Sequence, residues 1–181
     1  MRLSEDVLQG HSTGCQKITY YQARKRDKRI LGLILLAPSD DLNLARKGLG
    51  KNYGKAVLMA ERLIRTKHGD EFMPSRIGQG LVSANRFASF AIKGNAEADL
   101  FDYETGSFKL LKRIRIPIFA TFGSAEEHRT NVSPARALAM IKEKATASQK
   151  VDTALIKGAD HGFSGKEKEL ADAVARWIEK V

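Results

Sequence analysis

Apolar runs of strand length alternate along this chain with segments of helical period. The runs 30–37 and 116–122 are almost continuously apolar, a pattern typical of strands covered on both faces of a parallel sheet. Two less apolar segments, 6–9 and 151–156, are further strand candidates. Turn-forming residues follow each run, so we expect four short strands.

The segments between and after these runs predict helices. The predicted helices cover 15–25, 55–66, 83–93, 134–146 and the C-terminal residues after Ser164. Ser133 and Pro134 supply an N-cap and a first-turn proline for the fourth of them. Ser164 and Glu167 match a capping box for the last, and we expect Trp177 on its apolar stripe to be a packing residue.

Alternation of strands and helices predicts an α/β fold, with a mainly parallel sheet, flanking helices and right-handed crossovers. We expect a single domain over 1–181. The alternation breaks down between about 39 and 115, where helical segments are joined by turn-rich connections. An excursion of this length between two adjacent strands predicts a helical lid over one end of the sheet.

Composition narrows the class of protein. The chain has 181 residues, 43% of them apolar and 29% charged, as in ordinary globular domains. Its single cysteine excludes an intramolecular disulfide and any multi-cysteine metal site. No apolar run approaches the length of a membrane span, and the first six residues carry acids where a signal peptide needs apolar residues. We therefore expect a cytoplasmic protein with no membrane partner.

The net charge of +10, from 31 basic and 21 acidic residues, raises the question of a nucleic-acid partner. The densest basic clusters, 24–29 and 112–115, are short and precede predicted strands. No aromatic residues alternate with them to stack on bases. We expect a solvated basic surface and no nucleic-acid partner.

Residues 10–14, Gly-His-Ser-Thr-Gly, form a G-x-S-x-G sequence between a predicted strand and a predicted helix. In a nucleophile elbow this sharp turn exposes the serine hydroxyl, and the next backbone N–H points at the developing oxyanion. Ser12 is then the candidate nucleophile and the Thr13 N–H an oxyanion donor. The five-residue match alone fits a structural turn equally well.

An acid and a histidine follow in the order that such a site requires. Glu126 comes after the third predicted strand and His161 after the last. His161 would accept the Ser12 proton and return it to the leaving group, while Glu126 orients the imidazole. Asp40, after the second strand, and Glu127 are alternative acids.

Five segments together resemble a known group of enzymes. They are 10–16, 37–41, 83–90, 123–127 and 159–163. They are similar to the α/β-hydrolase superfamily and, more narrowly, to the uncharacterised group within it that includes fungal siderophore esterases. The resemblance implies a Ser-acid-His hydrolase that cleaves an ester or related acyl bond of a small molecule, without a metal or cofactor. It departs at Glu126, where the family usually has Asp.

A larger departure lies at the N-terminus. In the family the elbow follows the fifth strand, whereas only nine residues precede it here. The loop that supplies the second oxyanion donor is among the missing parts, and loss of one such donor costs about 100-fold to 1000-fold in rate. The strand at 6–9 would be an exposed edge. Our hypothesis is an N-terminally truncated hydrolase domain, with a homo-oligomer or a complementing chain at that edge.

Other reactive side chains fit structural roles better. Cys15 is expected to be a small buried packing residue, and His11 to pack beside Ser12 rather than contact substrate. His68 and His128 lack partners at metal-ligand spacing, so no metal site is predicted. Two functions remain open: a serine hydrolase, active alone or completed by another chain, and a catalytically silent fragment that acts as a binding or structural protein.

Overall fold

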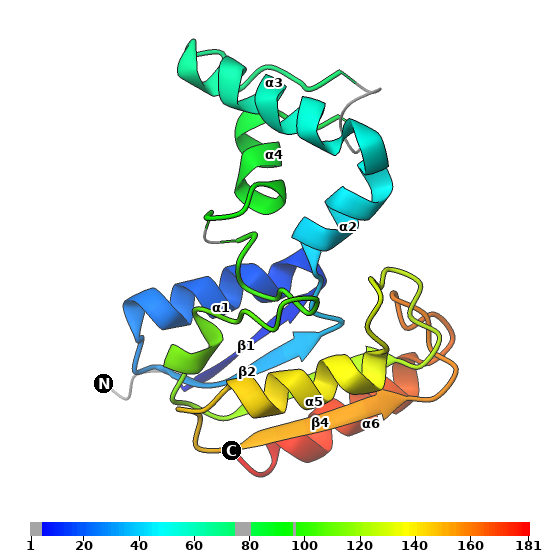
Figure 1. Cartoon of the computed structure of the whole chain (residues 1–181). Helices are drawn as coiled ribbons and strands as arrows, with labels where there is room; N and C mark the ends of the chain where they lie inside the picture. The colour runs from blue at the N-terminus through cyan, green and yellow to red at the C-terminus, as the bar shows by residue number, and fades with distance from the viewer. Residues whose placement is uncertain (1–4, 75–80, 96) are drawn as a thin grey trace.

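The structure is a computed structural model that describes residues 5–74, 81–95 and 97–181. Residues 75–80, which fall in the predicted lid, lie outside the described residues, as do residues 1–4 of the N-terminal segment. Four strands form one parallel sheet in the order β1-β2-β3-β4 (Figure 1). They are β1 (Asp6–His11), β2 (Ile30–Leu36), β3 (Ile118–Gly123) and β4 (Val151–Ile156). The prediction of a four-stranded parallel sheet is confirmed.

The register brings the four strand ends to one side of the sheet. His11 pairs with Leu36, Leu36 with Thr121, and Gly123 with Ile156. Because the strands are parallel, the loops that carry the candidate site residues all leave from this carboxyl end. β1 lies at the end of the sheet, and among the described strands it pairs with β2 alone.

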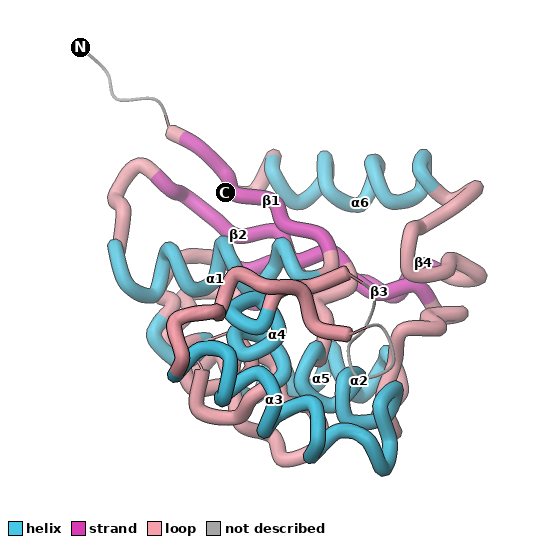
Figure 2. The backbone as a smooth tube through the Cα atoms, turned by 90° about the horizontal axis from the view of Figure 1, so that it is seen from above, coloured by secondary structure: helices cyan, strands magenta, loops and turns pink. Residues whose placement is uncertain are grey.

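Helices cover both faces of the sheet (Figure 2). α1 (Thr13–Lys25) and α5 (Pro134–Lys144) lie on one face, and α6 (Glu167–Ile178) lies on the other. The buried Trp177 of α6 stacks on Phe119 of β3 with ring centroids 5.8 Å apart. This contact anchors α6 to the sheet and fits the packing role predicted for Trp177.

The residues between β2 and β3, 37–117, are called the insertion below. It contains α2 (Asp41–Leu49), α3 (Tyr53–Arg65) and α4 (Ala84–Ala91), with short 3-10 turns at Gly50–Asn52 and Leu111–Arg113. These helices share a small core of their own, separate from the sheet core. Its largest members are Met73, Phe87 and Phe90. In Figure 1 α3 lies farthest from the sheet.

No helix in the described part of the chain is both long and apolar enough to span a membrane.

Two local predictions differ from the structure. The capping box predicted at Ser164 and Glu167 is wrong, because α6 begins at Glu167 and its N-cap Lys166 makes no side-chain cap. The Glu167 carboxylate instead accepts the Gly165 N–H at 2.9 Å, within a turn in which Gly165 has a φ of 68°. The sequence pattern also missed α2, because its C-terminal residues run into the glycines at 48 and 50.

Candidate active site

Ser12 occupies the turn that joins β1 to α1. Its φ of 54° and ψ of −125° lie in a region that non-glycine residues seldom adopt. The strain is held by a hydrogen bond in which the Ser12 N–H donates to the Leu36 carbonyl at 2.9 Å. Thr13 begins α1, so its N–H belongs to the first turn, whose amides have no partner within the helix. The geometry is the strand-turn-helix arrangement predicted for a nucleophile elbow.

Gly10 allows α1 to approach β1 closely. A Cβ at Gly10 would lie 2.6 Å from the Gly14 carbonyl carbon and oxygen. A Cβ at Gly14 would meet no atom of the described residues within 4 Å. The first glycine of the motif is therefore required by packing within this chain, whereas the second is not.

Alanine at these two positions should have opposite effects on stability. We expect Gly10→Ala to lower the free energy of unfolding by about 1–3 kcal/mol, because the added methyl overlaps the Gly14 backbone. Gly14→Ala should leave it unchanged or raise it by up to about 1 kcal/mol, because alanine favours a helix and meets no obstacle. Urea denaturation of both variants measures the difference, and an equal loss in both would contradict the close-approach argument.

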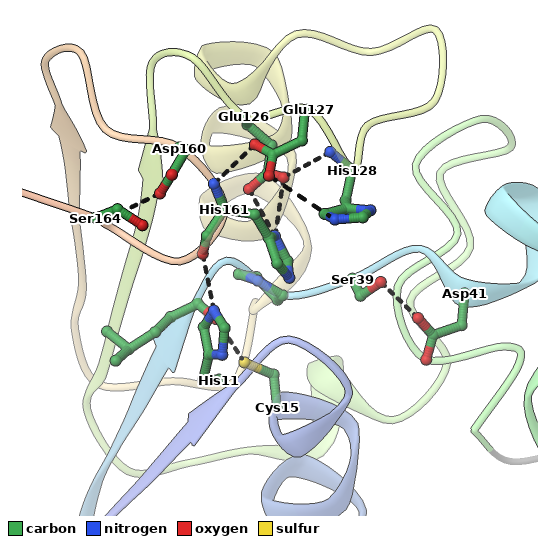
Figure 3. A network of polar contacts seen from close by, with 12 residues as sticks. His11, Cys15, Ser39, Asp41, Glu126, Glu127, His128, Asp160, His161 and Ser164 are labelled. Atoms are coloured by element: carbon green, nitrogen blue, oxygen red, sulfur yellow. Dashed lines mark hydrogen bonds and ion pairs between the residues drawn. The ribbon is translucent and has the colours of Figure 1, made fainter.

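His161 and Glu126 form a hydrogen-bonded pair near the strand ends (Figure 3). The His161 Nδ1 lies 2.8 Å and 3.0 Å from the two Glu126 carboxylate oxygens. The Glu126 side chain is 1% exposed, and it also accepts the His128 N–H at 2.9 Å. The hydrogen bond to Glu126 raises the pKa of His161 above its ordinary value. With Nδ1 donating to Glu126, the neutral ring keeps Nε2 as an acceptor.

A close contact between two loops brings this pair together. A Cβ at Gly123, the last residue of β3, would lie 2.1 Å from the Ala159 carbonyl oxygen. The Ala125 N–H donates to that same oxygen at 2.9 Å. The loop that carries Glu126 can therefore lie against the loop that carries His161 only because residue 123 has no side chain.

The two alternative acids have other partners. Asp40 caps α2 and accepts hydrogen bonds from Asn43 and from the Tyr103 N–H, and burial raises its pKa to about 6. Glu127 accepts the backbone N–H of His161 at 2.9 Å. Neither carboxylate hydrogen-bonds the His161 ring, so the structure pairs that ring with Glu126.

His11 and Cys15 contribute to the site's framework. The His11 Nε2 donates to the His161 carbonyl at 2.8 Å, and the two rings lie 4.9 Å apart between centroids. His128 packs its ring on His161 at 4.7 Å. The Cys15 side chain is fully buried, and burial raises its thiol pKa, which suits the predicted packing role. The spacing of His11 and His128 in the sequence carried no signal for these contacts with His161.

Ser12, Thr13 and His161 line one cavity of about 460 Å³. The insertion contributes Arg86 and Phe90 of α4 to its wall. A cavity of this size with mixed polar and apolar walls can hold a small molecule. In the described part of the chain, no group of three or more His, Cys, Asp or Glu side chains is placed to hold a metal ion.

The cavity also contains two charged side chains that the sequence did not single out. Asp41 accepts hydrogen bonds from Ser39 and from Gln16, and burial raises its pKa (Figure 3). Arg86 is held in place by Ser89 at 2.8 Å and by an ion pair with Glu97. The sequence pointed to Asp40, but its neighbour Asp41 is the residue that faces the cavity.

Comparison with protein-family models decides the family. The model described as "Protein of unknown function (DUF1749)" matches residues 2–181. The chain belongs to this family. No curated protein matches the DUF1749 chain in sequence.

Solved structures identify the fold. Est1E from Butyrivibrio proteoclasticus with bound ferulic acid superposes with a TM-score of 0.60 at 16% identity, covering 96% of this chain and 58% of its own. Monoacylglycerol lipase from Paleococcus ferrophilus superposes with a TM-score of 0.58 at 19% identity, and the match covers 97% of this chain and 68% of the lipase. A thermophilic esterase from Thermogutta terrifontis superposes with a TM-score of 0.51 at 20% identity, and the match covers 98% of this chain and 65% of the esterase. This DUF1749 chain therefore has part of the α/β-hydrolase fold, and it spans 58–68% of the length of these three structures.

Proposed function

We propose that this protein is a serine hydrolase that cleaves an ester or related acyl bond, with Ser12 as nucleophile, His161 as base and Glu126 as the orienting acid. The observation that carries the proposal is the hydrogen bond from His161 to the buried Glu126, because His161 also lines the cavity that Ser12 lines. The strained backbone of Ser12 at a strand-to-helix turn supports the same assignment.

The proposed reaction uses only side chains and backbone amides. His161 Nε2 accepts the Ser12 proton while Ser12 Oγ bonds to the acyl carbon, and the resulting oxyanion accepts the Thr13 N–H. The imidazolium, stabilised by Glu126, then gives its proton to the departing alcohol oxygen. Water attacks the acyl-enzyme with His161 again as the base, which releases the acid and restores Ser12. No metal or cofactor enters these steps.

The insertion would act as the lid of this site. Arg86 and Phe90 of α4 line the same cavity as Ser12, so the insertion would partly determine which substrates fit the site. The resemblance to the group that includes fungal siderophore esterases makes siderophore esters one substrate class to assay. The Est1E structure with ferulic acid and the monoacylglycerol lipase structure make esters of ferulic acid and monoacylglycerols two others.

A fluorophosphonate probe tests the nucleophile directly. We expect the wild-type protein to be labelled covalently at Ser12, because His161 can accept the hydroxyl proton when the serine attacks phosphorus. Ser12→Ala should lose the label entirely. Intact-mass analysis followed by peptide mapping measures both results.

Ser39 supplies a matched control. It lines the same cavity but donates its hydroxyl to Asp41 at 2.5 Å, away from His161. Ser39→Ala should therefore label as the wild type does. Absence of labelling in protein that is folded by circular dichroism would reject the hydrolase and favour the alternative of a silent binding or structural protein.

A further inference from the structure

Most of the chain's excess positive charge lies on one part of the insertion. Residues 46–67 contain seven basic residues and one acid, a net charge of +6 out of +10 for the whole chain. Five of these cations, listed here, make no ion pair among the residues that the structure describes: Lys51, Lys55, Arg62, Arg65 and Lys67. Nothing in the proposed chemistry uses them.

The outward face of α3 combines these cations with an exposed apolar side chain. Lys55, Leu58, Arg62 and Arg65 follow one another at spacings of three and four, so they share one face of the helix. Leu58 is 69% exposed, whereas Ala56 and Ala60 on the opposite face are fully buried in the core of the insertion. A leucine so exposed among cations contributes nothing to that core.

Apolar exposure continues beside this face. Leu58, Met59 and Leu63 line an open groove together with Lys55 and Arg62. The chain turns back along α3 after the helix ends (Figure 1). Glu71, which follows the helix, also lines the groove. The next residue, Phe72, is 65% exposed, and Leu81, in the same insertion, is 78% exposed. We call the outward face of α3 with Phe72 and Leu81 the α3 surface.

We propose that the α3 surface binds peripherally to membranes that contain anionic phospholipids. Lys and Arg side chains attract acidic headgroups, and exposed Leu and Phe side chains enter the boundary between headgroups and acyl chains. The proposal departs from the sequence-based expectation of no membrane partner, which rested on the absence of a spanning segment. Peripheral binding needs no such segment.

Charge and side-chain type disfavour two other occupants. A second copy would bring together two segments 46–67, each of net charge +6, and like charges repel. A nucleic acid would match the charge, but of the exposed apolar side chains Leu58, Phe72 and Leu81 only Phe72 has a ring on which a base can stack. An anionic lipid surface uses both the cations and the apolar side chains.

Vesicle cosedimentation tests the proposal with phosphatidylcholine vesicles and with vesicles that also contain phosphatidylserine. We expect binding to the anionic vesicles alone, weakened at high salt. Neutralising three cations in Lys55→Gln/Arg62→Gln/Arg65→Gln should weaken this binding by about 100-fold. Leu58→Ser should weaken it by roughly 10-fold. The exposure of all four residues means that circular dichroism and thermal stability should be unchanged.

A control variant removes the same charge elsewhere. Lys25→Gln/Lys28→Gln/Lys157→Gln alters exposed cations outside the insertion and should bind nearly as the wild type does. Equal losses in the two triple variants, or no binding by the wild type, would overturn the proposal. The proposal would also be overturned if the protein bound a DNA duplex but not vesicles, and if the triple substitution on α3 abolished the DNA binding. A dimer that Leu58→Ser dissociates would overturn it as well. Ser12→Ala should bind vesicles normally, so the result does not depend on hydrolase activity.

Discussion

Replacing His161 by glutamine is expected to lower kcat/KM for an activated ester on the order of 10^6-fold, the largest effect we predict for any substitution. Glutamine can still donate an N–H to the Glu126 carboxylate, which is 1% exposed. The variant therefore lacks a base without leaving a buried charge unpaired, and its loss of stability should be smaller than that of His161→Ala. Stopped assays with p-nitrophenyl esters and thermal melts measure the two quantities.

His128→Gln is the matched control for this substitution. His128 packs its ring on His161 at 4.7 Å, but its own side chain is 59% exposed and faces Glu127. Its replacement should change kcat/KM by less than about 10-fold, since it removes the ring packing on His161 and an exposed contact with Glu127 and leaves the His161–Glu126 hydrogen bond in place. The double variant Ser12→Ala/His161→Gln should be no slower than the single variants, because a nucleophile and its base act as one unit. Additive losses would contradict the proposed pairing.

Glu126→Gln is expected to lower kcat on the order of 10^4-fold, because an amide in place of the carboxylate can no longer stabilise the imidazolium or select the correct tautomer. Asp40→Asn should cost far less, since Asp40 hydrogen-bonds Asn43 and the Tyr103 N–H and not the His161 ring. Asparagine also preserves the side-chain cap of α2. Glu127→Gln should have an intermediate effect, because only the position of the His161 backbone depends on Glu127.

The pH dependence separates the role of Glu126 from a merely structural one. The Glu126 carboxylate raises the pKa of His161 above its ordinary value of 6.5. A base works only when neutral, so wild-type kcat/KM should rise with pH and reach half its maximum above 6.5. In Glu126→Gln the midpoint should move down, because the anion that favours the imidazolium is gone. An unchanged midpoint, or a larger loss in Asp40→Asn than in Glu126→Gln, would overturn the assignment of the acid.

Element order was predictable because it depends on local periodicity. The predicted strand at 151–156 coincides with β4, and the other three strands differ by only one or two residues at their ends. Helix starts were less predictable. Thr13 already belongs to α1, two residues before the predicted start, because the elbow turn runs directly into the helix. The start of α6 depends on the turn at Gly165, which no local cap pattern reports.

The sequence predicted which reactive residues follow the strands, but not which of them lie close together in the fold. The candidate acids Asp40, Glu126 and Glu127 follow two of the strands, and the sequence offered no means of ranking their distances to His161. The selection follows from the contact of Gly123 with Ala159, which joins two loops more than thirty residues apart. The same limit explains why Asp41 and Arg86 were missed as cavity residues, since the fold of the insertion places them there.

By itself, the sequence determined a parallel α/β sheet, a serine at a strand-to-helix turn, and an acid and a histidine after later strands, because hydrophobic period and turn chemistry act over a few residues. Only the tertiary structure decided which acid meets His161 and how the insertion's charges share one face of α3 with Leu58. Those outcomes depend on close packing between distant segments, where a missing Cβ or the rotation of a helix selects the neighbour. The net charge of +10, uninformative as a sum, gained meaning once its positions in space were known.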